Sequence, residues 1–187
     1  MSLMSYPRMF RARIIGGMFD VEDIRRLKKR GLVMGRNVKI MSGVVIDSSH
    51  CWLIDIGNNV TIAPGVHIIA HDASTKYHLG YTKIGRISIG DNTFIGARSV
   101  ILPNVRIGRN VVVGAGSVVT RNIPDGMVVA GNPASVVTTT TNYMNRHRKA
   151  MKKRPVFDTT WTLHGKISDK KKHEMKRMLR DGIGFIE

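Results

Sequence analysis

Between residues 38 and 137 the chain repeats one short pattern of hydrophobic and polar positions. A small or β-branched residue stands two places before an aliphatic residue, and this pair recurs at intervals of six residues. The pairs are Val38/Ile40, Val44/Ile46, Ile54/Ile56, Val60/Ile62, Val66/Ile68, Ile87/Ile89, Thr93/Ile95, Ser99/Ile101, Val105/Ile107, Val111/Val113 and Ser117/Val119. Because side chains two residues apart on a strand point the same way, each pair can face one core.

Turn-forming residues stand between the pairs. Examples are Gly57-Asn58-Asn59, Pro64-Gly65, Gly90-Asp91-Asn92, Pro103-Asn104 and Gly108-Arg109-Asn110. Short strands joined by corners every six residues are typical of a solenoid with three faces per coil and coils about 4.8 Å apart. Each coil buries its aliphatic pairs against the next, so several coils are needed for stability. The pattern therefore predicts an all-β solenoid.

The repeat is interrupted twice. Four extra residues precede Ile54, and 21 residues separate Ile68 from Ile89, which is not a multiple of six. We expect residues 69–86 to leave the coil as a loop, because they include charged, aromatic and glycine residues that a core would avoid. Long excursions from a rigid scaffold commonly carry function.

The regions on either side of the repeat are predicted to be helical. The chain then divides into an N-terminal helical segment (1–37), the repeat domain (38–137) and a basic helical C-terminal extension (138–187). Asp20 is a candidate cap for a short first helix. Near the other end, apolar spacing predicts helices over 141–153 and 168–180, the second capped by Ser168.

Composition narrows the partners and the compartment. The 187 residues carry a net charge of +17, and the middle hundred residues contribute only 8 basic and 5 acidic residues to it. Aromatic residues make up 6% and no recognition motif accompanies the basic residues, so we expect no nucleic-acid partner. A single cysteine, Cys51, excludes an intrachain disulfide and favours a reducing, cytoplasmic location. No apolar stretch approaches the roughly 18 residues of a membrane span.

Two stretches of the repeat resemble a known family. IGNNVTIAPGVHIIAHD and IGDNTFIGARSVILPNVRIGRNVVVGAGSVVTRNIPDGMVVAGNPA are similar to the hexapeptide-repeat acyltransferases, especially sugar O-acetyltransferases of the galactoside and maltose type. The resemblance covers about residues 36–137. It implies a left-handed parallel β-helix, a homotrimer with active sites between subunits, and acetyl-CoA lying along the coils as acyl donor.

His71 is the candidate catalytic residue, because the family places its catalytic histidine where the coil gives way to the loop. An imidazole, with a reference pKa of about 6.5, suits removal of a hydroxyl proton at neutral pH. Asp72 either contacts the acceptor, tunes His71 or caps the loop turn, and Tyr77 and His78 are candidate acceptor contacts. His67 with His71 also permits a zinc site like that of the gamma-class carbonic anhydrases, but the sequence context favours the transferase and no metal is expected.

The resemblance also assigns a donor site, residue by residue. The backbone N–H of Ala97 would meet the thioester carbonyl, and Phe94 would pack against the pantetheine arm. Ala115 stands where a small side chain lets that arm run close to the coil. Thr120 and Arg121 match positions near the adenine nucleotide, where an arginine can pair with a phosphate.

The function that follows is an acetyl-CoA-dependent O-acetyltransferase. It would transfer acetyl to a hydroxyl of a small-molecule or glycan acceptor, namely a sugar or surface-polysaccharide precursor. His71 would act as general base for direct attack on the thioester, without an acyl-enzyme, because no cysteine or serine is placed as a nucleophile beside it. Two alternatives stay open, an O-acetyltransferase for a drug or antibiotic on the same fold and a non-catalytic scaffold subunit.

Overall fold

The structure, a computed structural model, describes residues 21–187. The predicted cap Asp20 and most of the predicted N-terminal segment lie outside the described residues. The chain forms two compact units, one ending at residue 137 and one spanning residues 138–187. Each unit is described by itself.

The first unit is built from three sheets, which we call A, B and C. Sheet A has the strand order β1 (Val33–Met34), β4 (Ile54–Ile56), β9 (Ile87–Ile89) and β12 (Arg106–Ile107). Sheet B has the order β16 (Ser135–Thr139), β15 (Met127–Ala130), β13 (Val112–Val113), β10 (Phe94–Ile95), β5 (Thr61–Ile62) and β2 (Lys39–Ile40). Sheet C has the order β14 (Val118–Val119), β11 (Val100–Ile101), β6 (His67–Ile68) and β3 (Val45–Ile46).

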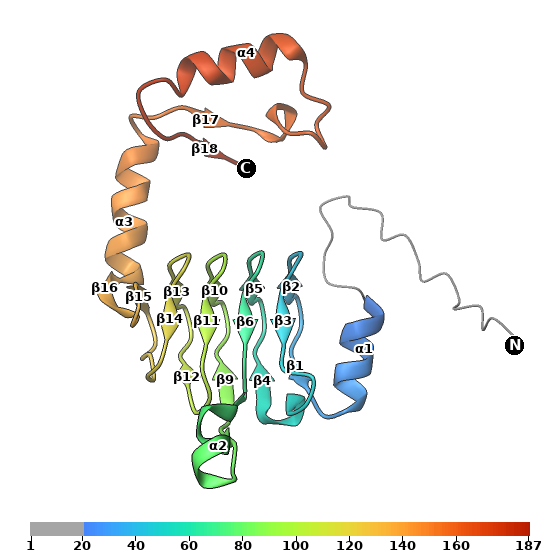
Figure 1. Cartoon of the computed structure of the whole chain (residues 1–187). Coiled ribbons are helices and arrows are strands. Elements are labelled where there is room, and N and C mark those ends of the chain that lie inside the picture. The colour runs from blue at the N-terminus through green and yellow to red at the C-terminus, as the bar shows by residue number, and fades with distance from the viewer. Residues whose placement is uncertain (1–20) are drawn as a thin grey trace, which may run out of the picture. The chain divides into compact units, whose positions relative to one another are not determined.

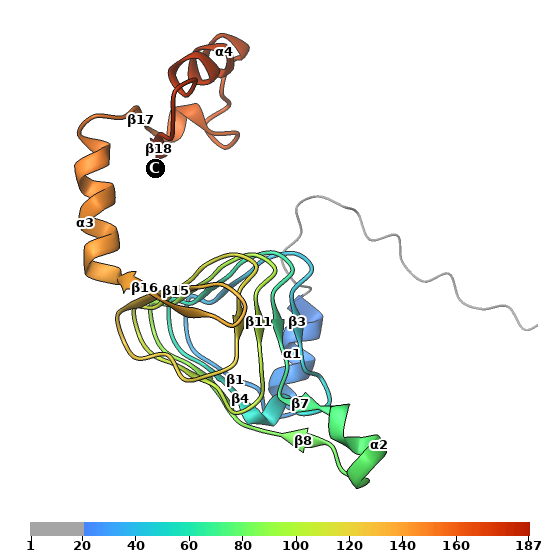
Figure 2. The same ribbon diagram turned by 60° about the vertical axis from the view of Figure 1, so that its left-hand side comes forward.

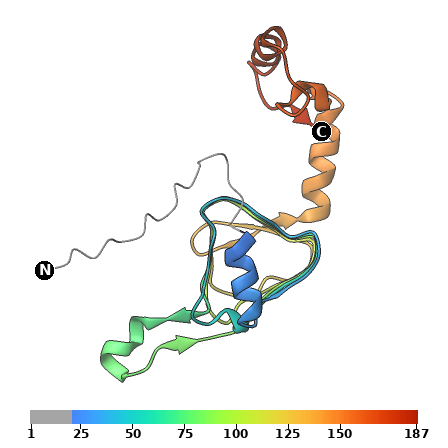
Figure 3. The same ribbon diagram turned by 90° about the vertical axis from the view of Figure 1, so that its right-hand side faces the viewer.

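The chain visits the three sheets in turn and so winds into stacked coils (Figure 1). Seen along the stack, the coils superpose on a three-sided outline (Figure 3). Strands of successive coils pair in parallel, as predicted. Their register aligns one aliphatic residue of each coil, as in the series Ile40, Ile62, Ile95 and Val113 of sheet B. The core is therefore a set of aliphatic ladders, one for each sheet.

Asparagines make the corners between sheet A and sheet B. Asn59, Asn92 and Asn110 have φ values of 54°, 56° and 54°, a left-handed conformation that asparagine tolerates better than most residues. Their side chains also join the coils, since Asn59 Nδ2 donates to Asn92 Oδ1 at 3.1 Å. The turn residues found in the sequence thus shape each corner and also connect it to the next.

Residues 69–86 leave the coil, but they are more ordered than a simple loop. β7 (His71–Asp72) and β8 (Lys83–Ile84) form an antiparallel pair, in which His71 lies opposite Ile84. Between them lie the 3-10 turn η2 (Ala73–Thr75) and the short helix α2 (Lys76–Leu79). We call this segment the hairpin; it projects from the side of the coils (Figure 2). Its two strands fix the direction in which the chain leaves the core at residue 71.

Helix α1 (Val21–Lys29) precedes the first coil. Its Leu27 is buried, and the Leu27 carbonyl accepts a hydrogen bond from the Sγ of Cys51 at 3.6 Å. Cys51 begins the 3-10 turn η1 (Cys51–Leu53), which lies within the first interruption of the repeat. The helix therefore packs on the residues that the interruption adds.

The second unit contains α3 (Thr140–Met151), η3 (Thr159–Trp161), α4 (Asp169–Met178) and the parallel strands β17 (Val156–Phe157) and β18 (Phe185–Ile186). The Ser168 side chain accepts a hydrogen bond from the Lys171 N–H, so the predicted cap of α4 is confirmed. Phe157 is buried in this unit, with its ring 4.9 Å from that of Trp161. No helix in the described part of the chain combines the length and the apolar character needed to cross a membrane.

Strand β10 can be used to test whether successive side chains of a strand point alternately into the core and into solvent. Ile95 is fully buried, whereas Phe94 is 43% exposed. Ile95→Ala should lower the free energy of unfolding by about 2–5 kcal/mol, because it leaves a cavity between coils. Phe94→Ala removes more atoms but should cost less than about 1 kcal/mol, because its side chain faces outward. Urea unfolding followed by circular dichroism measures both, and equal losses would contradict the alternation.

Candidate active site

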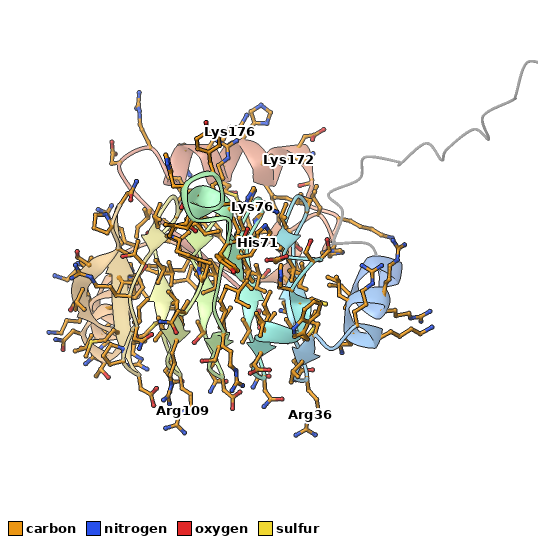
Figure 4. The ribbon with its side chains drawn as sticks, turned by 60° about the horizontal axis from the view of Figure 1, so that its bottom comes forward. Arg36, His71, Lys76, Arg109, Lys172 and Lys176 are labelled. Carbon is orange, nitrogen blue, oxygen red and sulfur yellow. The ribbon has the colours of Figure 1, made fainter. Side chains whose placement is uncertain are left out.

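His71 and Asp47 form the closest polar contact at the base of the hairpin. Nδ1 of His71 lies 2.5 Å from Oδ2 of Asp47. The Asp47 side chain is 2% exposed, whereas that of His71 is 37% exposed. In Figure 4 His71 lies near the base of the hairpin, whose helix α2 carries Lys76. The pair thus joins a buried carboxylate to a ring that reaches solvent.

Backbone amides hold Asp47 in place. Its Oδ1 accepts hydrogen bonds from the N–H groups of Ser49 at 3.0 Å and His50 at 3.1 Å. Its Oδ2 accepts a third from the N–H of Ala70 at 3.0 Å. Burial raises the pKa of Asp47, but the hydrogen bonds from His71 and from the backbone of His50 and Ser49 outweigh it, so the pKa lies below its ordinary value. Asp47 is therefore a carboxylate at neutral pH.

The hydrogen bond to Asp47 sets the proton on His71. A carboxylate can only accept hydrogen bonds, so Nδ1 carries the proton and donates it. The other ring nitrogen, Nε2, then keeps a free lone pair. Within residues 21–187 no protein group bonds to that nitrogen. His71 can accordingly take a proton from a molecule bound beside it.

A second histidine, His50, lies against this pair. Its ring centroid is 5.1 Å from that of His71, and its Nδ1 is 3.9 Å from Oδ2 of Asp47. That nitrogen is buried and, among the described residues, is one of two buried side-chain polar atoms without a hydrogen-bond partner. The His50 ring also packs against that of Trp52, with the ring centroids 5.4 Å apart. Asp47, His50 and His71 thus form one cluster, which we call the Asp-His-His cluster.

The cluster is built by the two interruptions of the repeat. Asp47 and His50 lie in the extra residues after β3, and His71 lies in the excursion after β6. Strands β3 and β6 are paired, with Ile46 opposite Ile68. Both interruptions therefore leave the coil at the same corner, between sheet C and sheet A, in adjacent coils. Sequence reasoning missed Asp47 and His50, although the four extra residues before Ile54 were the signal that could have found them.

The carboxylate of Asp72 does not bond to His71 but to Ser74 and Lys83. Its Oδ1 accepts a hydrogen bond from the N–H of Ser74 at 2.8 Å, and its Oδ2 pairs with Nζ of Lys83 at 2.7 Å. The hydrogen bonds from Lys83 and Ser74 lower the pKa of Asp72 to about 2. Asp72 thus caps the turn η2 and ties together the two strands of the hairpin.

Tyr77 and His78 lie on α2, at the far end of the hairpin. Tyr77 is 92% exposed, and its ring packs edge-on against that of His78 at 5.2 Å. His67, on β6, is also exposed and is not part of the Asp-His-His cluster. The chain by itself therefore brings His71 together with Asp47 and His50, and leaves Tyr77 and His78 in solvent.

The expected donor residues fall on two different corners of the coil. Ala97 and Ala115 lie where the chain passes from sheet B to sheet C, at adjacent coils joined by a hydrogen bond from Gly116 N–H to the Ala97 carbonyl at 2.7 Å. The N–H of Ala97 itself donates to no described carbonyl. Thr120 and Arg121, both exposed, lie at the corner between sheet C and sheet A that also carries His71. Phe94 faces outward on sheet B.

An open groove of about 750 Å³ lies elsewhere, on the outer face of sheet A. Two ion pairs line it, Asp55 with Arg86 at 2.9 Å and Asp125 with Arg109 at 2.9 Å. Arg109 marks this edge of the coil in Figure 4, away from His71. No residue of the Asp-His-His cluster lines the groove, so it is not part of the candidate site.

Comparison with known proteins finds a family model that matches part of the chain, and a set of similar folds. Residues 86–121 match the family described as bacterial transferase hexapeptide (six repeats). Protein CapG of Staphylococcus aureus is 41% identical over 88 residues, a match that covers 43% of this chain and 49% of that protein. The chain thus spans about half the length of this relative.

Two examples illustrate the solved structures that are similar to the chain. The hexapeptide-repeat acetyltransferase of Vibrio cholerae has a TM-score of 0.50 at 22% identity, covering 66% of this chain and 82% of that one, and so shares the fold. A maltose O-acetyltransferase from Clostridium difficile has 31% identity and a TM-score of 0.48, covering 63% of this chain and 73% of that one. The chain therefore carries the hexapeptide repeat of bacterial transferases and is similar to the hexapeptide-repeat acetyltransferases.

Proposed function

We propose that this protein is an acetyl-CoA-dependent O-acetyltransferase that acts on a hydroxyl of a sugar or surface-polysaccharide precursor. One observation carries the proposal: His71 donates through Nδ1 to a buried carboxylate and presents a free Nε2 at the surface. This arrangement makes a general base from an ordinary histidine. The hexapeptide match over residues 86–121 adds support for a transferase.

His71 would remove the proton of the acceptor hydroxyl. As the proton moves to Nε2, the hydroxyl oxygen attacks the thioester carbonyl carbon, the C–S bond breaks and CoA thiolate leaves. Asp47 stabilises the imidazolium that forms, because its negative charge lies 2.5 Å from Nδ1. Three backbone amides keep the carboxylate from turning away while the ring is charged.

The corner between sheet B and sheet C suits the acyl donor. The unengaged N–H of Ala97 can donate to the carbonyl oxygen as that oxygen becomes negative. The exposed ring of Phe94 offers an apolar surface for the pantetheine arm, and Ala115 leaves the neighbouring corner open. Thr120 and Arg121 are exposed and available for the nucleotide.

A homotrimer would complete the site. Within one chain, His71 follows strand β6 and Ala97 precedes strand β11, so they lie at opposite ends of the strands of sheet C. A single copy therefore separates the base from the oxyanion donor. A three-fold axis beside the coils can bring the corner that carries His71 in one copy against the corner that carries Ala97 in its neighbour. The proposal includes the left-handed winding that the family resemblance implies and the reducing, cytoplasmic setting that the single cysteine favours.

The proposal is tested by an acceptor screen that measures release of the CoA thiol from acetyl-CoA. Simple sugars, nucleotide sugars and antibiotics with free hydroxyls form the panel. Acetylation of a sugar is expected, whereas acetylation of antibiotics alone would favour the drug-modifying alternative. Failure to bind acetyl-CoA at all would favour a scaffold.

His71→Ala should lower turnover by about 10²–10⁴, the usual contribution of a positioned base, which equals roughly 3–5 kcal/mol of barrier. Binding of acetyl-CoA should be nearly unchanged, because the expected donor contacts lie at other positions of the coil. Steady-state kinetics and calorimetric binding of acetyl-CoA separate the two effects. Retention of more than about a third of wild-type turnover, with chemistry limiting the rate, would overturn the assignment.

Asp47→Asn should also lower turnover by about 10² or more, because the amide no longer holds the proton on Nδ1 or stabilises the imidazolium. The asparagine Oδ1 can keep the hydrogen bonds from Ser49 and His50, so folding should persist. Asp55→Asn is the matched control, since it breaks an ion pair with Arg86 outside the site. If both variants lose activity equally, Asp47 has no special role in the reaction.

The trimer is tested in solution. Sedimentation or light scattering should give three chains per particle at assay concentrations, because a site split over two corners needs a neighbouring copy. Mixing His71→Ala chains with chains in which Ala97 is replaced by proline should restore part of the activity, since some interfaces then combine two intact halves. A monomeric active enzyme would rule out the shared site.

A further inference from the structure

We propose that the Asp-His-His cluster is also a zinc site, with Oδ2 of Asp47, Nδ1 of His50 and Nδ1 of His71 as its three protein ligands. One ligand atom from each of these residues lies within 4.8 Å of those of the other two. Oδ2 of Asp47 is 3.9 Å from Nδ1 of His50 and 2.5 Å from Nδ1 of His71. Two imidazole nitrogens and one carboxylate oxygen are ligands that Zn²⁺ commonly takes in proteins. Binding does not depend on the proposed transfer reaction.

The unpartnered nitrogen of His50 is the observation that points to a metal. Buried polar atoms almost always have a hydrogen-bond partner, yet Nδ1 of His50 has none and faces Oδ2 of Asp47 at 3.9 Å. This distance is too long for a direct hydrogen bond. It is also short for a bridging water, because two hydrogen bonds of about 2.8 Å through one water span about 4.5 Å.

A zinc ion suits this spacing better. With bonds of about 2.0–2.2 Å, a tetrahedral Zn²⁺ places its ligand atoms about 3.4 Å apart. The distance from Asp47 to His50 is slightly longer, 3.9 Å, and that from Asp47 to His71 is shorter, 2.5 Å. Movements of less than about 1 Å in the two rings would bring both distances to the tetrahedral value.

The carboxylate of the site is already oriented. Oδ1 of Asp47 accepts from Ser49 and His50, and Oδ2 accepts from Ala70. Such hydrogen bonds to a ligand are the usual support of a metal site. Among the described residues the cluster offers three ligands, so a fourth position would be open to water.

Zinc would compete with the proton that makes His71 a base. The ion takes the place of the proton on Nδ1, and the ring then carries its remaining proton on Nε2 if it stays neutral. A neutral ring that is protonated at Nε2 has no lone pair there to take the proton from the hydroxyl group of the acceptor molecule. Inhibition by zinc therefore rests on the proposed function, whereas zinc binding does not.

The first arm of the experiment measures binding alone. Full-length protein freed of metal is dialysed against micromolar ZnCl₂, with MgCl₂ as a second probe, and bound metal is counted per chain. We expect one Zn²⁺ per chain and no bound Mg²⁺, which prefers oxygen ligands. His50→Ala should weaken zinc binding at least about tenfold. His67→Ala, which removes an exposed histidine outside the cluster, should bind zinc like the wild type.

The second arm measures activity with zinc present. Zinc should inhibit the wild type and the His67→Ala protein, whereas the turnover that His50→Ala shows without zinc should not fall when zinc is added. Unchanged zinc binding in His50→Ala would overturn the site, as would zinc binding that is lost only in His67→Ala. Should His50→Ala fail to fold, His71→Ala replaces it in the dialysis, where lost zinc binding supports the site and retained binding overturns it. Zinc binding without inhibition would leave the site standing and count against His71 as the base.

Discussion

The in-register stacking of successive coils is the constraint on which the whole first unit depends. Along sheet B, Ile62 lies opposite Ile95 and Ile95 opposite Val113, and backbone hydrogen bonds accompany each step. A shift of one residue would turn the buried side chains outward and break these bonds. The coil therefore has one register, and additional residues can leave it only at a corner.

This constraint explains how an irregular site arises in a regular fold. The extra residues after Ile46 and those after Ile68 emerge at the same corner, because the two isoleucines are paired. The regular part of the coil thus fixes the distance between two irregular segments. Asp47 comes one residue after its ladder position and His71 three residues after its own, so neither has much freedom to move apart.

Asp47 is the group that holds the cluster together. Three backbone amides and one ring nitrogen donate to it, and its side chain is 2% exposed. With a proton on Nδ1 of His71, the cluster presents a base to solvent. With a metal ion in the place of that proton, the same atoms become ligands, because a carboxylate and two imidazoles accept either cation. A proton on Nδ1 of His71 would make the site a base, whereas a metal ion bound to that nitrogen would make it a metal site.

The sequence by itself determined the repeat and the features that follow from local chemistry. The six-residue spacing indicated short strands and buried pairs, the turn residues marked the corners, and the failed spacing after Ile68 located the excursion. The resemblance to a known family then singled out His71 at the start of that excursion. Each of these features depends on residues that are close together in the sequence. Asn59, for example, adopts the left-handed conformation of its own corner, and Ser168 caps the helix that follows it. Residue type and spacing suffice for such features.

The tertiary structure alone decided which side chains meet. Asp47 and His71 are 24 positions apart, and the distance between them follows from the pairing of two coils. The excursion became a hairpin in which Asp72 binds Lys83, a contact that depends on the register of β7 and β8. Nδ1 of His50 has no hydrogen-bond partner where its ring packs against those of Trp52 and His71. Contacts between coils depend on stacking register. The interruptions of the repeat mark the irregular corners, but only the stacked coils set the distances between the side chains that meet there.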